Sequence, residues 1–274
     1  AEILQLPNPY GMPKNLSVVP QDMDMDMIML GAMYAPTEQI TFMSMATFNA
    51  KSMNLRTYQP MMNRNALGNF STKSSDLSII NLSALLKIYE NDNSKFHAQI
   101  GIEKNIGKSD ANSQVLKPMG NVGSIIMPYG MQGGDKSLSL LSAITYTKTY
   151  GVWKMGGQIR SKTNIKNKEW NFGDSHELNI WGQRDINNIS ALSLRVKVQD
   201  IKPVDGTDKN IRAPVQTADP RNYGGITVSL GIGINILLPR GSIGLETYKP
   251  ISRDLNGPQM GMDWALQAGY RLSF

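Results

Sequence analysis

The sequence predicts an all-β protein, an antiparallel transmembrane β-barrel of about 12 strands. Three observations indicate this fold. Runs of about ten residues alternate apolar and polar side chains, which is the period-two pattern of strands with one apolar face. Short connections between these runs alternate with long ones, as in barrels with tight turns at one rim and longer loops at the other. The last run has apolar or aromatic residues at every second position and ends the chain on Phe274.

The composition excludes several classes of protein. The 274 residues are 41% hydrophobic with a mean hydropathy of −0.29. No apolar run approaches the roughly 18 residues of a membrane helix, so a helical membrane protein is excluded. There is no cysteine, and therefore no disulfide framework or thiolate metal site. The net charge of +6 is spread without a Lys/Arg block, so we expect no nucleic-acid partner.

Strands are expected in an order that alternates short and long connections. A soluble β-sandwich has no reason to sort its connections in this way. The expected strands are 22–34, 39–51, 76–89, 95–105, 136–147, 152–162, 175–183, 190–199, 224–237, 242–250 and 263–274. The expected tight turns are 35–38, 90–94, 148–151, 184–188 and 239–241, and the long loops are roughly 52–75, 106–135, 163–174, 200–223 and 251–262.

The two faces of each expected strand differ in chemistry. In the strand at 190–199, Leu194 and Val196 alternate with Arg195 and Lys197. A Lys or Arg at mid-bilayer costs about 2–4 kcal/mol, so the apolar wall should face lipid and the polar wall the lumen. In a water-soluble protein the apolar face would be a core. The last strand argues against that alternative, because it has apolar residues at every second position and ends the chain on the aromatic Phe274. The residues expected to line the lumen are His97, Gln99, Glu103, Lys154, Arg160, Arg195, Lys197, Glu246 and Arg271.

Methionine is concentrated in the first two expected strands. In the second, Ile40, Phe42 and Phe48 take one face, so methionines at 43 and 45 take the other. Pairing across the turn at 35–38 places the methionines of both strands on one inward face. They are Met23, Met25, Met27, Met29, Met33, Met43 and Met45. With position 29 opposite 43 or 45, the densest patch should comprise Met27, Met29, Met43 and Met45, while Asp24 and Asp26 point outward at the loop end.

This methionine row has two interpretations. Thioethers are soft ligands, so the seven methionines are candidate ligands for Cu(I) or another soft metal ion. Alternatively, methionine fills an irregular lumen as adaptable packing or offers an apolar wall to a solute. No other cofactor is expected.

Two function classes remain open. One is a channel or transporter for small solutes, in which an excess of inward Lys and Arg favours anions. The other is a non-conducting barrel that acts as an adhesin, a receptor or a structural partner in a surface complex through loops 106–135 and 200–223. An enzyme is not expected, because the histidines stand in "HAQ" at 97–99 and "HEL" at 176–178. Neither supplies the His-x-Ser pair of outer-membrane phospholipases, and no rim cluster of acids and histidine can be assembled.

Three segments together resemble a known group of proteins. They are "DMDMDMIMLGAMYAPTEQITFMSMATF" at 22–48, "TADPRNYGG" at 217–225 and "DLNGPQMGMDWALQAGYRLSF" at 254–274. The group comprises Gram-negative outer-membrane proteins described as transporters and related to channels of phenol-degradation meta-pathways. The resemblance implies the bacterial outer membrane, contact with its lipid and lipopolysaccharide, and recognition of the strand ending at Phe274 by the barrel-assembly machinery.

The N-terminal region is expected to lie outside the barrel. Residues 1–21 are predicted as a loop segment and 22–274 as the barrel, because "LPNPYGMPKN" is rich in turn formers. Single-chain bacterial barrels close with an even number of strands, and members of the group begin with a further Met-bearing strand. We therefore expect a first strand upstream of Ala1. The start of the chain lacks a signal-peptide pattern, so that peptide was cleaved or lies further upstream.

Overall fold

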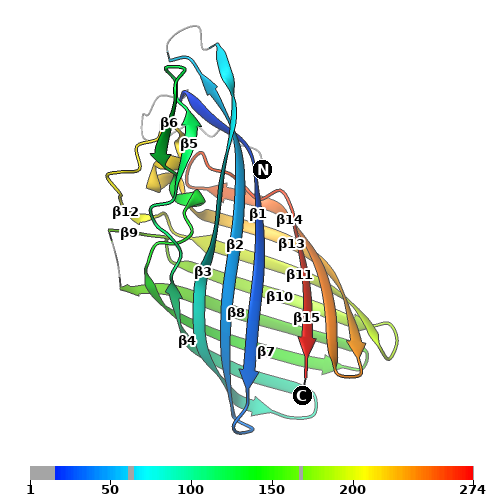
Figure 1. The fold of residues 1–274 in the computed structure, drawn as a ribbon. Coiled ribbons are helices and arrows are strands. Elements are labelled where there is room, and N and C mark those ends of the chain that lie inside the picture. The colour runs from blue at the N-terminus through cyan, green and yellow to red at the C-terminus, as the bar shows by residue number, and fades with distance from the viewer. Residues whose placement is uncertain (1–15, 61–64, 167–168, 274) are drawn as a thin grey trace.

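The computed structural model describes residues 16–60, 65–166 and 169–273. Within these ranges, an 11-stranded antiparallel sheet pairs each strand with the next along the chain (Figure 1). This confirms the predicted all-β fold. The strands are β1 (Val18–Tyr34), β2 (Ile40–Tyr58), β3 (Ala66–Glu90), β4 (Ser94–Asn105), β7 (Leu138–Tyr150), β8 (Trp153–Lys166), β10 (Ser175–Asp185), β11 (Ser190–Ile201), β13 (Gly225–Leu238), β14 (Gly241–Leu255) and β15 (Ala265–Leu272).

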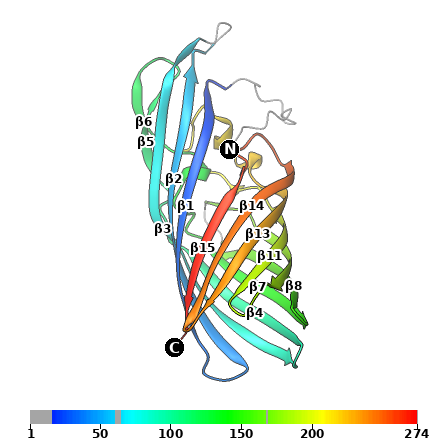
Figure 2. The same cartoon turned by 90° about the vertical axis from the view of Figure 1, so that its right-hand side faces the viewer.

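The sheet curls until its first and last strands lie side by side (Figures 1 and 2). Because all neighbouring pairs are antiparallel, β1 and β15 run in the same direction. No ladder joins them among the described residues, and an antiparallel ladder between two strands of the same direction is impossible. One strand of opposite direction would complete the ring. The expected strand upstream of Ala1 stays a prediction.

The connections sort by length as predicted. Tight turns join the strands at one end of the barrel, and the long connections gather at the other end (Figure 1). The long connections contain short elements of their own. They are β5 (Asn112–Leu116), β6 (Val122–Ile126), β9 (Trp170–Asn171), β12 (Asp205–Gly206), and the 3-10 turns η1 (Tyr129–Met131), η2 (Gln216–Ala218) and η3 (Pro220–Asn222). None of the helices in the described ranges has the length and hydropathy needed to cross a bilayer.

Burial distinguishes the two faces of the sheet. On the concave inner face, Ser83 and Leu141 are 7% and 2% exposed, whereas Ile100 and Ile144 on the outer face are each 53% exposed. The same two faces continue through the cross-strand pairs from β2 to β8. The outer face is therefore a continuous apolar surface that can face lipid, and polar side chains point toward the barrel axis.

The prediction of a long loop at 52–75 is wrong, because β2 and β3 continue through most of this range. Up to Phe48 the outward positions of β2 are apolar except for Ser44. Beyond Phe48, Met53 and Leu55 face inward while Asn54 and Arg56 face outward. The apolar phase is thus inverted where the strand leaves the lipid band. With 25 residues, β3 extends about 80 Å, far more than the roughly 30 Å of hydrocarbon.

Other boundaries also differ from the sequence-based expectation. β1 begins at Val18 rather than at position 22, and Val18 N–H donates to the Pro214 carbonyl at 3.2 Å. β14 runs to Leu255, which shortens the loop expected at 251–262. Residues 1–15 of the predicted N-terminal loop and the terminal Phe274 lie outside the described residues.

Leu30 and Met29 test the assignment of the faces. Leu30 is 78% exposed near the middle of the outer apolar band, and its neighbour Met29 lies on the inner face. We expect Leu30→Arg to destabilise the protein in lipid vesicles by about 2–4 kcal/mol, because the charge enters hydrocarbon. Met29→Arg should cost much less. Urea unfolding in vesicles measures both, and an equal or larger cost for Met29→Arg would contradict the assignment.

Candidate functional site

The inner face carries the residues that the sequence analysis assigned to the lumen. Cross-strand register places all of them on the face that also carries Lys51 of β2. They are His97, Gln99, Glu103, Lys154, Arg160, Arg195, Lys197, Glu246 and Arg271. Period-two alternation thus brings these nine residues from five strands to one concave surface.

Two ion pairs on this surface reach across an intervening strand. Arg195 Nε donates to Glu246 Oε1 at 2.9 Å across β13, and Lys162 Nζ lies 3.3 Å from Glu103 Oε1 across β7. The Arg195 and Glu246 side chains remain 27% and 17% exposed. Solvent therefore reaches charged groups inside the curled sheet.

Glycine makes room for two aromatic rings on the inner face. A Cβ at Gly156 would lie 2.3 Å from Cζ2 of Trp181, so the indole covers this glycine on the neighbouring strand. A Cβ at Gly231 would likewise lie 2.7 Å from Cε1 of Tyr248. Each ring carries a cation above it: Arg195 Cζ is 5.2 Å from the Trp181 centroid, and a lysine, Lys197, has Nζ 5.0 Å from that of Tyr248.

The methionine row lies on the inner face of β1 and β2, but its expected register is wrong. Met27 is opposite Asn49 and Met29 is opposite Thr47, so Met27 does not belong to the densest patch with Met43 and Met45. The ladder closes with Tyr34 opposite Phe42, because Pro36 has no N–H and Thr37 Oγ1 accepts the Ile40 N–H at 3.1 Å. Met33 is opposite Met43, and Met45 is opposite Gly31. The methionines that surround Gly31 are Met29, Met33, Met43 and Met45.

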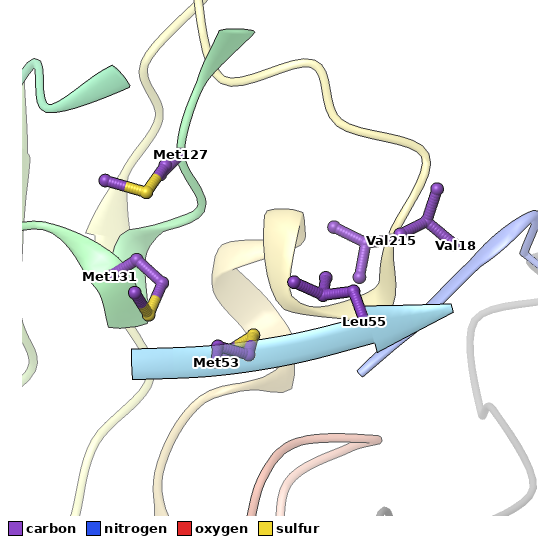
Figure 3. Packing of buried hydrophobic residues seen from close by; sticks show 6 residues of the cluster. All are labelled: Val18, Met53, Leu55, Met127, Met131 and Val215. Carbon is purple, nitrogen blue, oxygen red and sulfur yellow. The ribbon is translucent and has the colours of Figure 1, made fainter. Parts of the chain in front are cut away.

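A second methionine cluster, which the sequence analysis missed, joins the barrel wall to the long loops (Figure 3). Met53 of β2 packs with Met127 and Met131 of the loop between β4 and β7, all at most 2% exposed. Val18, Leu55 and Val215 complete this core, and Met23 packs against it. Only the alternation that continues through Met53 and Leu55 could have indicated it, because the loop methionines follow no period.

The long connections between β4 and β7, β8 and β10, and β11 and β13 together form a cap at the loop end of the barrel. The cap contains a second core, which is aromatic. Tyr129 contacts Trp170 at 4.9 Å and Tyr223 at 6.0 Å between ring centroids, with edge-to-face geometry. Val204 and Ile211 are buried in the same cluster. Residues from three long connections therefore share one dry core at the loop end of the barrel.

Lys51 fastens this cap to the wall. Its Nζ donates to the carbonyl oxygens of Gly130 and Gln132 at 2.9 and 2.7 Å. The Gln132 side chain in turn accepts the Ala111 N–H and donates to the Met127 carbonyl. Tyr223 Oη accepts the Gly130 N–H at 2.9 Å, and burial raises the pKa of its phenol, so Tyr223 stays protonated. Segment 127–132 is thus held by the wall, by its own loop and by the loop that carries Tyr223.

Metal ligands of the usual types do not gather anywhere in the described ranges. No group of three or more Asp, Glu and His side chains there could hold a metal ion. Besides the buried cluster of Met53, Met127 and Met131, the methionines around Gly31 are soft donors that lie close together by register. Their predicted role as metal ligands stays a prediction.

An apolar groove on the outer face is separate from this site. It is lined chiefly by outward residues of β1 to β4, among them Ala32, Tyr34, Phe42, Leu82 and Ile100. The small Ala32 and Ser44 lie opposite each other between larger side chains. The groove belongs to the apolar band rather than to the charged interior.

Comparison with known proteins adds information about the fold. The chain matches no family model and no curated protein sequence. Among solved structures it is similar to an outer membrane channel from Pseudomonas putida F1, with 14% identity, a TM-score of 0.53, and coverage of 91% of this chain and 82% of that chain. The chain has the fold of an outer-membrane β-barrel. It is also matched to OmpT, an outer membrane protein of Vibrio cholerae, at 9% identity over 99% of both chains with a TM-score of 0.41.

Substitution of Lys51 tests whether this side chain holds the cap. Lys51→Met keeps the length of the side chain but leaves the Gly130 and Gln132 carbonyls without their donor, at a cost of about 1–3 kcal/mol. We expect faster hydrogen exchange across 127–132, measured by mass spectrometry. Lys73→Met, on the outward face of β3, is the matched control. Equal exchange in both variants would show that the cap is held without Lys51.

Proposed function

We propose that the protein is an outer-membrane channel for small solutes whose external entrance is covered by the cap. The observation that supports it is the inner face, where charged and polar side chains of many strands remain partly exposed to solvent. Inward charges set the selectivity of a pore. The fold of outer-membrane barrels and the apolar outer face also support a location in the outer membrane and a role as a channel.

The cap gives this channel an entrance that can be closed. Its two cores lie at the loop end of the barrel, and the methionines of the first provide adaptable apolar contacts. A set of hydrogen bonds centred on Lys51 holds the covering segment in one place. We propose that solutes enter when this segment detaches from the wall.

The methionine row adds an apolar strip to the interior. Met25, Met27, Met29 and Met33 keep 47–59% of their surface exposed, which suits contact with a passing solute. Passage of Cu(I) or another soft ion is the second use we consider, because four thioethers surround Gly31. If soft ions pass, replacing Met29, Met33, Met43 and Met45 with leucine should abolish Ag(I) binding measured by competition with a chelator. Unchanged Ag(I) binding by this variant would exclude passage of soft ions.

The remaining expectations belong to the same proposal. The protein would act without catalysis, in contact with outer-membrane lipid and lipopolysaccharide, after insertion by the barrel-assembly machinery. A non-conducting receptor, adhesin or structural partner in a surface complex is the alternative. The cap could provide the contact surface for such a partner.

Planar-bilayer recording tests the channel. We expect purified protein to give small, discrete current steps, and Lys51→Met to increase the time spent open, because the cap loses its attachment to the wall. Lys73→Met should behave as the parent protein. Absence of current steps from the parent and from Lys51→Met would contradict the channel and favour the receptor alternative.

A further inference from the structure

The charges of the inner face are not balanced. Each acid on the wall formed by β8 to β14 is already held by a protein donor. Glu246 accepts from Arg195 and Tyr248, Asp185 from Lys154, and Glu177 from Asn179. Among the described residues, no carboxylate lies within ion-pairing distance of Lys197 or Arg160. Arg160 is directly opposite Glu177, whose hydrogen-bond donor Asn179 is uncharged. The two cations therefore flank one acid, and the middle of this wall keeps one positive charge in excess.

These two cations are near each other in the ladder. Lys197 is opposite Asn179 of β10, which is opposite Gln158 of β8. Arg160 lies two residues beyond Gln158 on the same face of β8. Strand spacings of about 4.8 Å and 6.7 Å along the strand keep the two backbones roughly 12 Å apart. Side chains as long as those of Lys and Arg can converge on one small anion across that distance.

The surroundings of Lys197 leave its ammonium free to bind. Its position over the Tyr248 ring attracts the cation without neutralising it. The neighbouring Arg195 is committed to Glu246 at 2.9 Å and does not compete for an anion. Lys197 is thus the cation on this wall that offers hydrogen-bond donors without an acid of its own.

The methionine strip lies on β1, which β15 separates from this wall. β1 and β15 are side by side in both views, and β15 pairs with β14, which carries Tyr248 and Glu246 (Figures 1 and 2). From Met27 to Met33, the inward positions of β1 hold only methionine and Gly31. The interior therefore presents excess positive charge on the wall of β8 to β14 and an uncharged, polarizable apolar strip on β1.

We infer that the channel takes small amphiphilic monoanions, in particular carboxylates with a short aliphatic tail. Lys197, with Arg160, binds the carboxylate, and Met29 and Met33 contact the tail. This inference rests on the proposed function and names the class of its substrate. Inorganic anions would use the cationic wall alone, and neutral apolar solutes would use the methionine strip alone.

Block of the ionic current by sodium hexanoate, compared with sodium acetate, tests both the contact with the carboxylate and the contact with the tail. Each methylene in apolar contact is worth about fourfold in affinity, so hexanoate should block the parent channel far better than acetate. Lys197→Gln should weaken block by both anions by about tenfold, because a charge-assisted contact is lost. The double variant Met29→Gln and Met33→Gln should weaken block by hexanoate and leave block by acetate unchanged.

Lys209→Gln and Met119→Gln, both on exposed parts of the cap, are the matched controls and should leave block unchanged. A channel that conducts but is blocked equally by acetate and hexanoate, or equally with and without Lys197, would overturn the inference and leave the proposed function standing. If the parent does not conduct, equilibrium binding of radiolabelled hexanoate to the detergent-solubilised protein decides instead. Binding that Lys197→Gln does not weaken would overturn the inference there too.

Discussion

Hydrogen bonding between neighbouring strands is the constraint on which this structure depends. In hydrocarbon an unpaired backbone N–H or C=O costs several kcal/mol, so each strand must pair along its length with the next. Such pairing imposes period two on the side chains. Long runs such as Val18–Tyr34 must therefore sort every residue to lipid or to the interior, and the charged inner surface follows from that sorting.

This sorting explains why much of the fold could be predicted from sequence. The alternation of Leu194 and Val196 with Arg195 and Lys197 fixes the phase of β11 without knowledge of any contact. The same logic located the other long strands and the tight turns. It failed between positions 52 and 75, because apolar residues such as Met53 and Leu55 turn inward there to meet the cap. A change of surroundings from lipid to water reverses the apolar phase, and the pattern no longer matches that of a membrane strand.

The cap could not be predicted, because its contacts join segments far apart in sequence. Lys51 donates to carbonyls about eighty positions further along the chain, and the Tyr223 hydroxyl, from another loop, accepts the Gly130 N–H. Every residue has a backbone carbonyl, so the sequence does not show which carbonyls will accept a hydrogen bond. The register of the methionine hairpin failed for a related reason, since the geometry of the turn at Pro36 and Thr37 decided it rather than the alternation.

The glycines beneath the inner rings have a consequence for how such barrels diversify. Trp181 can lie along the wall only while position 156 lacks a Cβ, and Tyr248 depends on position 231 in the same way. One mutation to alanine at either position would turn a ring toward the axis and narrow the bore, with the strands and their pairing unchanged. Evolution can thus adjust the width of the passage by small steps beneath aromatic residues, without rebuilding the barrel around them.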